Sequence, residues 1–142
     1  MTTKRNTTAK ELLLSYLEAQ GITASRTKVG INFQVEGWNY LLWHDAEAPL
    51  FFRLTLPGIF DVTDENYAQA LMACNMLNWN YKVVKASLYE YNEDGRQRAS
   101  VWVCYEQWLD GGSPQTDLVA RAVSALMEAA EQFQRLAERG ES

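Results

Sequence analysis

Two alternating runs of apolar and polar residues, joined by a short acidic segment, constrain the fold of this 142-residue chain most. The runs Val83–Tyr91 and Ala99–Trp108 repeat with a period of two, the period of a half-buried strand. Between them stands Asn92-Glu93-Asp94-Gly95, where Gly95 can supply the positive φ of a tight turn. The pattern therefore predicts an antiparallel hairpin.

Three further strands are predicted before this hairpin. The segment Lys28–Glu36 alternates apolar and polar residues, and Glu36-Gly37 suits a tight turn into a second strand, Trp38–His44. A third strand, Leu50–Leu56, is expected to end at Pro57-Gly58. Because the connections are short, these strands are expected to form an antiparallel meander.

The first helix is predicted at about Ala9–Gln20. Thr8 and Glu11 have the spacing of a capping box, in which the threonine hydroxyl accepts the backbone N–H three residues on. Gly21 suits the left-handed position just after a helix.

Two more helices are predicted, one on each side of the hairpin. Thr63 is the expected N-cap of the second helix, with acidic residues in its first turn. Ser113-Pro114 resembles an N-cap followed by proline at the first helical position, and this last helix is expected to reach about Glu138. Its expected core positions are Val119, Ala122, Leu126, Ala129, Phe133 and Leu136.

The order of elements is therefore α-β-β-β-α-β-β-α, with no internal repeat and no long linker. This order predicts an α+β fold, an antiparallel five-stranded sheet with the helices packed mainly on one face. We expect residues 1–142 to form a single domain with an ordered core at about 8–138.

Charge and hydropathy exclude several classes of partner. With 13 basic and 18 acidic residues the net charge is −5, and no stripe of Lys and Arg offsets it, so nucleic acid is not an expected partner. No segment has the pattern of a signal peptide or approaches the roughly 18 apolar residues of a membrane span. We therefore expect a cytoplasmic protein that does not bind membranes.

The residue types that carry most enzyme chemistry are sparse. The chain has one histidine, His44, and two cysteines, Cys74 and Cys104, without a nucleophile-elbow motif or a metal-ligand spacing. Both cysteines are expected to be buried apolar residues, and His44 a loop or edge residue. The sequence predicts no enzyme activity, no metal and no cofactor.

The face of the sheet that turns away from the helices is unusually aromatic. If Val84, Ala86, Leu88, Val101, Val103 and Tyr105 point to the helices, aromatic residues occupy the opposite face, which in an antiparallel sheet is normally polar. Such a face suits contact with a protein chain or a second subunit, although the rings can also cover one another across strands. The candidate partner-binding residues are Tyr89, Tyr91, Trp102, Trp108, Phe51 and Arg53.

Asparagines crowd the junction between the second helix and the hairpin. Asn78 or Asn80 is expected to end the helix in the left-handed conformation. Asn75 and Asn78 are interpreted as structural residues whose amides form buried hydrogen bonds.

This junction also resembles a known family. The segment Asn75-Met76-Leu77-Asn78, the strand Val83–Leu88, the turn Glu93-Asp94-Gly95 and an answering strand resemble the YbjN-like family of small bacterial proteins. The resemblance spans about Ala9 to Phe133. It implies the fold of type III secretion chaperones and a non-enzymatic, often dimeric domain that binds other proteins.

Two functional hypotheses follow from the sequence. The first is a chaperone-like or regulatory protein-binding module that forms a homodimer. The second is a small-molecule-binding domain with an aromatic-lined pocket between sheet and helices. A hydrolase that uses His44 is a third and weaker class, because no Gly-x-Ser-x-Gly elbow is present and neither cysteine lies near His44 in the sequence.

Overall fold

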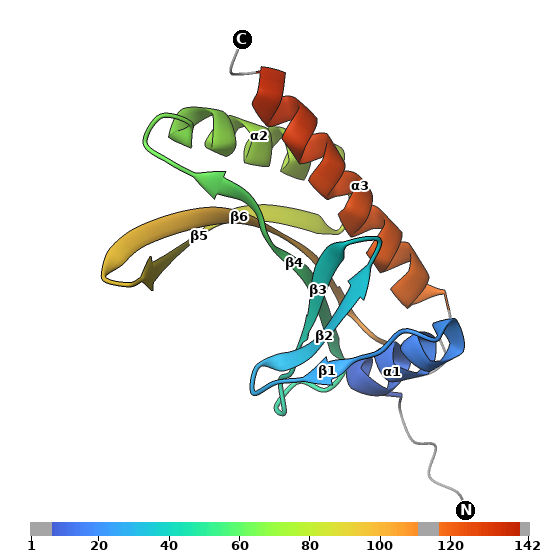
Figure 1. Ribbon diagram of the computed structural model, residues 1–142. Coiled ribbons are helices and arrows are strands. Elements are labelled where there is room, and N and C mark those ends of the chain that lie inside the picture. Colours follow the sequence, from blue (N-terminus) through green and yellow to red (C-terminus); the bar gives the residue numbers. More distant parts are fainter. Residues whose placement is uncertain (1–6, 111–116, 140–142) are drawn as a thin grey trace, which may run out of the picture.

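The computed structural model describes residues 7–110 and 117–139. It shows a bent antiparallel sheet with its three helices over one face, so the predicted α+β class is confirmed (Figure 1). The elements are α1 (Ala9–Gln20), β1 (Ser25–Arg26), β2 (Gly30–Val35), β3 (Trp38–Trp43), β4 (Phe51–Val62), α2 (Tyr67–Asn80), β5 (Val84–Glu93), β6 (Arg96–Trp108) and α3 (Leu118–Arg139).

The sheet has six strands, so the prediction of five strands and of the order α-β-β-β-α-β-β-α was wrong. The missed strand is β1, which pairs with β2 through only two residues and is too short to show an alternating pattern. The strands lie in the order β1-β2-β3-β4-β6-β5, which confirms the meander and leaves β5 at an edge.

Strand β4 does not end at Pro57-Gly58, as the sequence suggested. It continues to Val62, and its register with β6 shifts between Leu56 and Phe60. Gly58, at φ 63°, provides the left-handed backbone of this irregularity. Proline and glycine therefore mark a bulge in a long strand here, rather than its end.

Both predicted tight turns are present. Glu36 and Gly37 have φ values of 50° and 84°, and Asp94 and Gly95 have 51° and 79°. Positive φ at both central residues is typical of the two-residue turn that matches the twist of a hairpin. Each turn therefore fixes the register of the strands that it joins.

Helix α1 has the predicted ends. The Oγ1 of Thr8 accepts the backbone N–H of Glu11 at 3.1 Å, and Gly21 follows the helix at φ 68°. The N–H of Ala9 donates to the carbonyl of Pro49 at 2.9 Å, which attaches the start of the helix to the β3–β4 loop.

Helix α2 starts later than predicted, because Thr63 does not cap it. The N–H of Thr63 donates to the Oδ1 of Asn66 at 2.7 Å, and the N–H of Asn66 donates to the Oγ1 of Thr63 at 3.3 Å. This reciprocal pair closes a turn in front of the helix, and Asn66 is the residue at its N-cap position. Thr63 does accept a backbone N–H, as an N-cap residue would, but it does so in the turn that precedes the helix.

The end of α2 also differs from the prediction. Tyr81, in the extended conformation, follows Asn80, and neither Asn78 nor Asn80 has a positive φ. Val83 instead occupies the left-handed region, at φ 55°. The backbone reverses there, after the asparagines.

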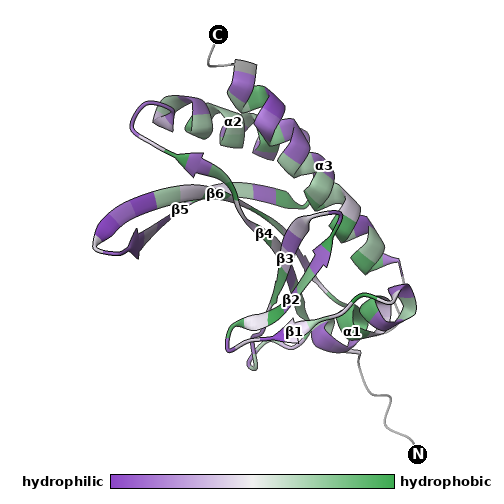
Figure 2. Ribbon diagram, in the orientation of Figure 1, coloured by the Kyte–Doolittle hydropathy of each residue, from purple (hydrophilic) through white to green (hydrophobic). Residues whose placement is uncertain are grey.

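Helix α3 lies across the sheet and buries a stripe of small and large apolar side chains (Figure 2). Of its predicted core positions, Leu136 is partly buried and the other five are fully buried. The expected N-cap at Ser113-Pro114 lies outside the described residues. Tyr40 from β3 donates its hydroxyl to the carbonyl of Val123 at 2.9 Å, and burial raises the pKa of this tyrosine well above its usual range.

Candidate functional site

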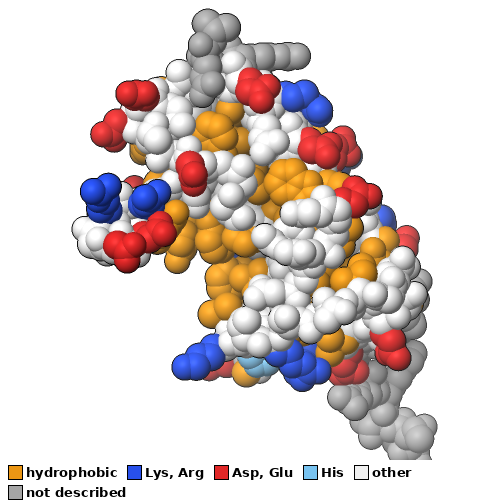
Figure 3. All heavy atoms as spheres, in the orientation of Figure 1, with side chains coloured by type: hydrophobic (Ala, Val, Ile, Leu, Met, Phe, Trp, Pro, Cys, Tyr) orange, Lys and Arg blue, Asp and Glu red, His pale blue; other side chains and the backbone are white. Residues whose placement is uncertain are grey.

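The face of the sheet opposite the helices forms a hollow. It lies between the β5–β6 hairpin and the β1–β2 end of the sheet, and Figure 3 shows hydrophobic side chains gathered there. The tip of the hairpin is hydrophilic, as Figure 2 shows. No helix in the described part of the chain covers this face, so its side chains are available to a partner.

Aromatic rings from three strands, β3, β6 and β5, form a continuous row on this face. The centroids of Trp43 and Trp102 lie 6.2 Å apart, those of Trp102 and Tyr89 4.4 Å apart, and those of Tyr89 and Tyr91 6.0 Å apart. At these separations the rings contact one another in stacked and tilted arrangements. We call the following set the aromatic surface: Trp43, Phe51, Arg53, Tyr89, Tyr91, Trp102 and Trp108.

The polar atoms of the two central tryptophans are satisfied within the protein. The Nε1 of Trp43 donates to the Oγ1 of Thr55 at 2.8 Å, and that hydroxyl lies 3.2 Å from the Sγ of Cys104. The Nε1 of Trp102 donates to the Oγ of Ser100 at 2.9 Å. The rings are thereby fixed in orientation, and they offer apolar faces to a partner rather than free donors.

Charged groups border the rings. The guanidinium carbon of Arg53 lies 4.8 Å from the centroid of the Trp43 ring, within the range of a cation–π contact. The Nζ of Lys85 is 2.6 Å from the Oε1 of Glu106, in a pair that is partly open to solvent. An apolar centre with a charged rim is the usual anatomy of a protein interface.

The structure brings the predicted partner-binding residues onto one face but in two groups. The central row includes Tyr89, Tyr91 and Trp102. The second group is the pair Phe51 and Trp108, whose ring centroids lie 4.9 Å apart near one end of the row. Arg53 joins the central row through its contact with Trp43.

Trp43 is a member of this surface that the sequence reasoning missed. The signal was present in the alternation of β3, because Tyr40 and Leu42 are buried toward the helices and the odd-numbered positions point the other way.

One of the two readings of the aromatic face, that the rings cover one another across strands, is confirmed in part. Rings cover one another, and beneath them Thr55 and Cys104 are almost completely buried. The outer parts of the surface remain open, since Tyr89 is 47% exposed and Trp108 is 64% exposed. The surface is therefore preformed and still accessible.

Comparison with known proteins places the chain in a family. The family model YbjN, described as "Putative bacterial sensory transduction regulator", matches residues 10–139. The chain belongs to the YbjN family. Among solved structures, it is similar to the "Crystal structure of YbjN, a putative transcription regulator from E. coli", with a TM-score of 0.55 and 13% sequence identity. The similarity covers 91% of this chain and 88% of that chain, and it shows that the two share a fold. No curated protein matches.

In this YbjN-family chain the asparagine junction is architectural at one position. Both side chains are largely exposed, but the amide of Asn78 forms two hydrogen bonds to the backbone of Ala86 in β5, whereas the amide of Asn75 forms none with the described residues. The prediction that Asn75 also forms a buried hydrogen bond was therefore wrong.

The outer face of α2 is a second feature that the sequence reasoning missed. Met72, Met76 and Trp79 are spaced as one helical face and are 65%, 41% and 88% exposed. The signal that marks this face is the absence of any charged residue from Tyr67–Asn80, since an ordinary surface helix is charged on its outer side. We call these three residues the α2 stripe.

The residues that were considered for catalysis are not assembled into a site. Both cysteines are buried, and burial raises the pKa of the Cys74 thiol to about 11, which keeps it protonated at neutral pH. His44 is exposed at the end of β3. Within the described residues no group of three His, Cys, Asp or Glu side chains is arranged to hold a metal ion. No described helix is both long and apolar enough to cross a membrane.

Proposed function

We propose that this protein is a non-enzymatic regulatory module of the cytoplasm that binds another protein through the aromatic surface. The observation that carries the proposal is the row from Arg53 through Trp43 and Trp102 to Tyr89, which lies on a face that no described helix covers. The description of the family as a regulator agrees with such a role. So does the resemblance of the sequence to chaperone-like domains.

The physical case rests on rigidity and low desolvation cost. Rings whose N–H groups are already bonded to Thr55 and Ser100 lose little freedom when a partner covers them. Aromatic side chains that are preformed in this way are the usual anchors of an interface, and a nearby arginine adds a charge that can orient the partner. The expected partner is a protein segment with apolar side chains for the hollow and an acidic group near Arg53.

A matched pair of tyrosine variants tests the proposal. Tyr89 on the aromatic surface and Tyr67 on α2 are almost equally exposed, at 47% and 48%, so each loses a similar solvent-facing ring when changed to Ser. The tagged protein is recovered from its native cells, and co-purifying proteins are identified by mass spectrometry. We expect a stoichiometric partner with the wild type and with Tyr67→Ser, and its loss with Tyr89→Ser and Trp102→Ser.

Thermal unfolding of each variant separates binding from folding. A variant that melts close to the wild type and still loses the partner supports the aromatic surface. Partner retention by both Tyr89→Ser and Trp102→Ser, each still folded, would overturn the proposal. Loss of the partner in Tyr67→Ser alone would move the site to α2.

We propose further that two copies of the chain associate through the α2 stripe. A chain with a net charge of −5 repels a second copy least where the surface is uncharged, and α2 has no charged residue. The three exposed side chains are of types that are favoured at the buried centre of an interface.

The mass of the protein in solution tests the homodimer. Trp79→Glu places a charge in the stripe, whereas Ser124→Glu adds the same charge to the exposed side of α3. In light scattering coupled to size exclusion, we expect dimers for the wild type and Ser124→Glu and monomers for Trp79→Glu. A monomeric wild type over the micromolar range contradicts this part of the proposal.

A further inference from the structure

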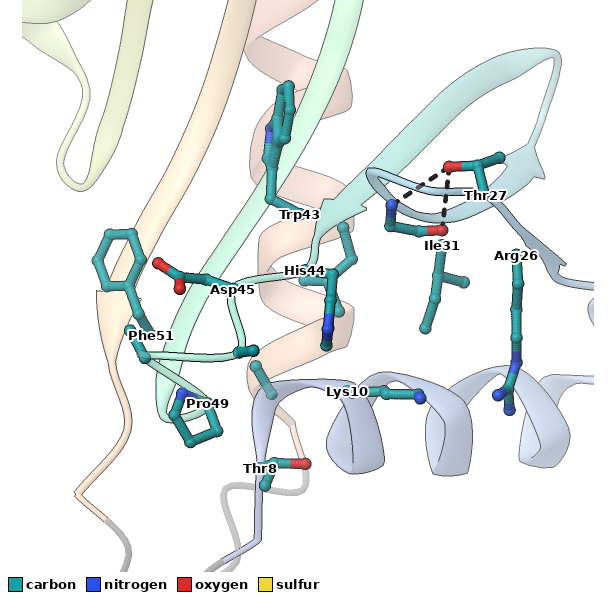
Figure 4. A pocket seen from close by; sticks show the side chains of 15 residues that line it. Thr8, Lys10, Arg26, Thr27, Ile31, Trp43, His44, Asp45, Pro49 and Phe51 are labelled. Atoms are coloured by element: carbon teal, nitrogen blue, oxygen red, sulfur yellow. Dashed lines mark hydrogen bonds between the residues drawn. The ribbon is translucent and has the colours of Figure 1, made fainter.

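A pocket that adjoins the hollow lies between the start of α1, the β1–β2 turn and the β3–β4 loop (Figure 4). It has a volume of about 430 Å³, which falls within the range of sites for small organic molecules. The sequence predicted an aromatic-lined pocket between sheet and helices, and this one lies at the edge of the sheet beside α1, with Trp43 and Phe51 among its lining residues.

The walls of the pocket are held by two backbone hydrogen bonds and one to a side-chain hydroxyl. The N–H of Ala9 donates to the carbonyl of Pro49, and the N–H of His44 donates to the carbonyl of Val29, both at 2.9 Å. The hydroxyl of Thr27 accepts the N–H of Gly30 at 3.2 Å, which closes the turn beside the pocket. These bonds join all three segments, so the cavity exists before any ligand arrives.

The interior of the pocket is apolar. Ala9, Ile31 and Leu42 line it and are almost fully buried, because they are also part of the hydrophobic core. Pro49 and Ala48 from the loop add further apolar surface. Only the carbon skeleton of a ligand gains from contact with such a floor.

The rim of the pocket is cationic, although the whole chain is acidic. Lys10 and Arg26 line it together with His44, and Figure 4 shows Arg26 and His44 reaching toward α1, which carries Lys10. Within residues 7–110 and 117–139, neither Lys10 nor Arg26 has an ion-pair partner. The one lining carboxylate, Asp45, accepts the N–H of Glu47 at 3.0 Å and points away from them, toward Phe51.

We propose that this pocket binds a small organic carboxylate with an apolar body. The carboxylate is held by Lys10 and Arg26, whose ammonium and guanidinium groups form charge-assisted hydrogen bonds to such an anion. The apolar body lies against Ile31 and Leu42. This proposal does not depend on the aromatic surface, since the two cations and the floor lie outside it.

Three ten-carbon probes with the same chain separate charge from hydrophobicity: decanoate, decanol and decylammonium. Binding to the full chain is measured by titration calorimetry, and its location by amide chemical shifts in NMR. We expect decanoate to bind at least tenfold more tightly than decanol, and decylammonium more weakly than either. The largest shifts are expected at Ala9, Ile31 and Leu42.

Matched variants assign the binding to the rim. Lys10→Gln and Arg26→Gln are each expected to weaken decanoate about tenfold, the effect of one charge-assisted hydrogen bond. Lys28→Gln removes the same charge from the same turn outside the pocket, and we expect it to leave the affinity unchanged. Ala48→Phe, which fills the cavity from the loop, is expected to abolish binding while the amide spectrum stays folded.

Several results would overturn the proposal. The first is that neither decanoate nor the shorter, more rigid naphthoate binds detectably. The second is that decanoate and decanol bind with equal affinity. The third is that Lys28→Gln weakens decanoate binding as much as Lys10→Gln does. Shifts confined to Trp102 and Tyr89 would also overturn it, because they would place the ligand in the hollow.

Discussion

The side-chain amide of Asn78 pairs with both backbone groups of Ala86. Its Oδ1 accepts the N–H of Ala86 at 2.6 Å, and its Nδ2 donates to the carbonyl of Ala86 at 3.0 Å. One residue near the end of α2 thus imitates a neighbouring strand for edge strand β5 and fixes the helix against it. Only an amide supplies a donor and an acceptor in this geometry.

Asn78→Ala is expected to lower the free energy of unfolding by about 1 to 3 kcal/mol, since it leaves two partly buried backbone groups without partners. Asn75→Ala, three residues earlier, removes a similarly exposed amide that has no hydrogen bond to the described residues, so it is the control and is expected to change the free energy of unfolding by less than about 0.5 kcal/mol. Urea unfolding measures both. Equal effects of the two substitutions would show that the amide pairing contributes nothing.

The different contacts of Asn75 and Asn78 show which parts of the fold the sequence could predict and which it could not. The junction between α2 and β5 was predicted, although its left-handed residue is Val83 and not an asparagine. Which amide meets a backbone group depends on the rotation of α2, and that rotation is set by packing against α3 and β5. Strand β1 and the true start of α2 were missed for a related reason. Their determining contacts, such as the pair Thr63 and Asn66, leave no periodic trace in the sequence.

Of the two candidate sites, one could be predicted from the sequence and the other could not. The aromatic surface was predictable, because a period of two assigns Tyr89 and Trp102 to one face whatever the rest of the chain does. The pocket was not, because Lys10 and Arg26 stand far from His44 in the sequence and meet only through the meander and the position of α1.

Gly30→Ala is expected to destabilise the protein by about 3 kcal/mol or more. A Cβ at this position would overlap the carbonyl oxygen of Leu42 in the paired strand β3, and a backbone atom cannot move aside as a side chain can. Gly58→Ala is the control, because it meets no neighbouring atom within 4 Å and costs only the strain of its positive φ, about 1 kcal/mol. Thermal unfolding that ranks Gly58→Ala as the more damaging change would refute this account.

Val83→Asn is expected to stabilise the protein by up to about 1 kcal/mol. Valine at φ 55° is strained, because its branched Cβ crowds the backbone in the left-handed region, whereas asparagine tolerates that region. The side chain is 54% exposed, so little buried surface is lost. Val29→Asn, at a similarly exposed position without positive φ, is the control and should not raise the melting temperature.

Cys74→Ala is expected to remove part of the alkaline destabilisation of the protein. Burial raises the pKa of this thiol to about 11, above its ordinary value of about 8.5, so the folded state holds the proton more tightly than the unfolded state. The stabilisation from this thiol is complete below about pH 8.5 and is lost as the pH rises toward 11.

Urea unfolding of wild type and variant at pH 8 and pH 11 measures this loss of stability. The wild type should lose about 2 to 3 kcal/mol more than Cys74→Ala over this interval. Because other titrating groups, including Tyr40, are common to both proteins, parallel losses would mean that the thiol is not shifted.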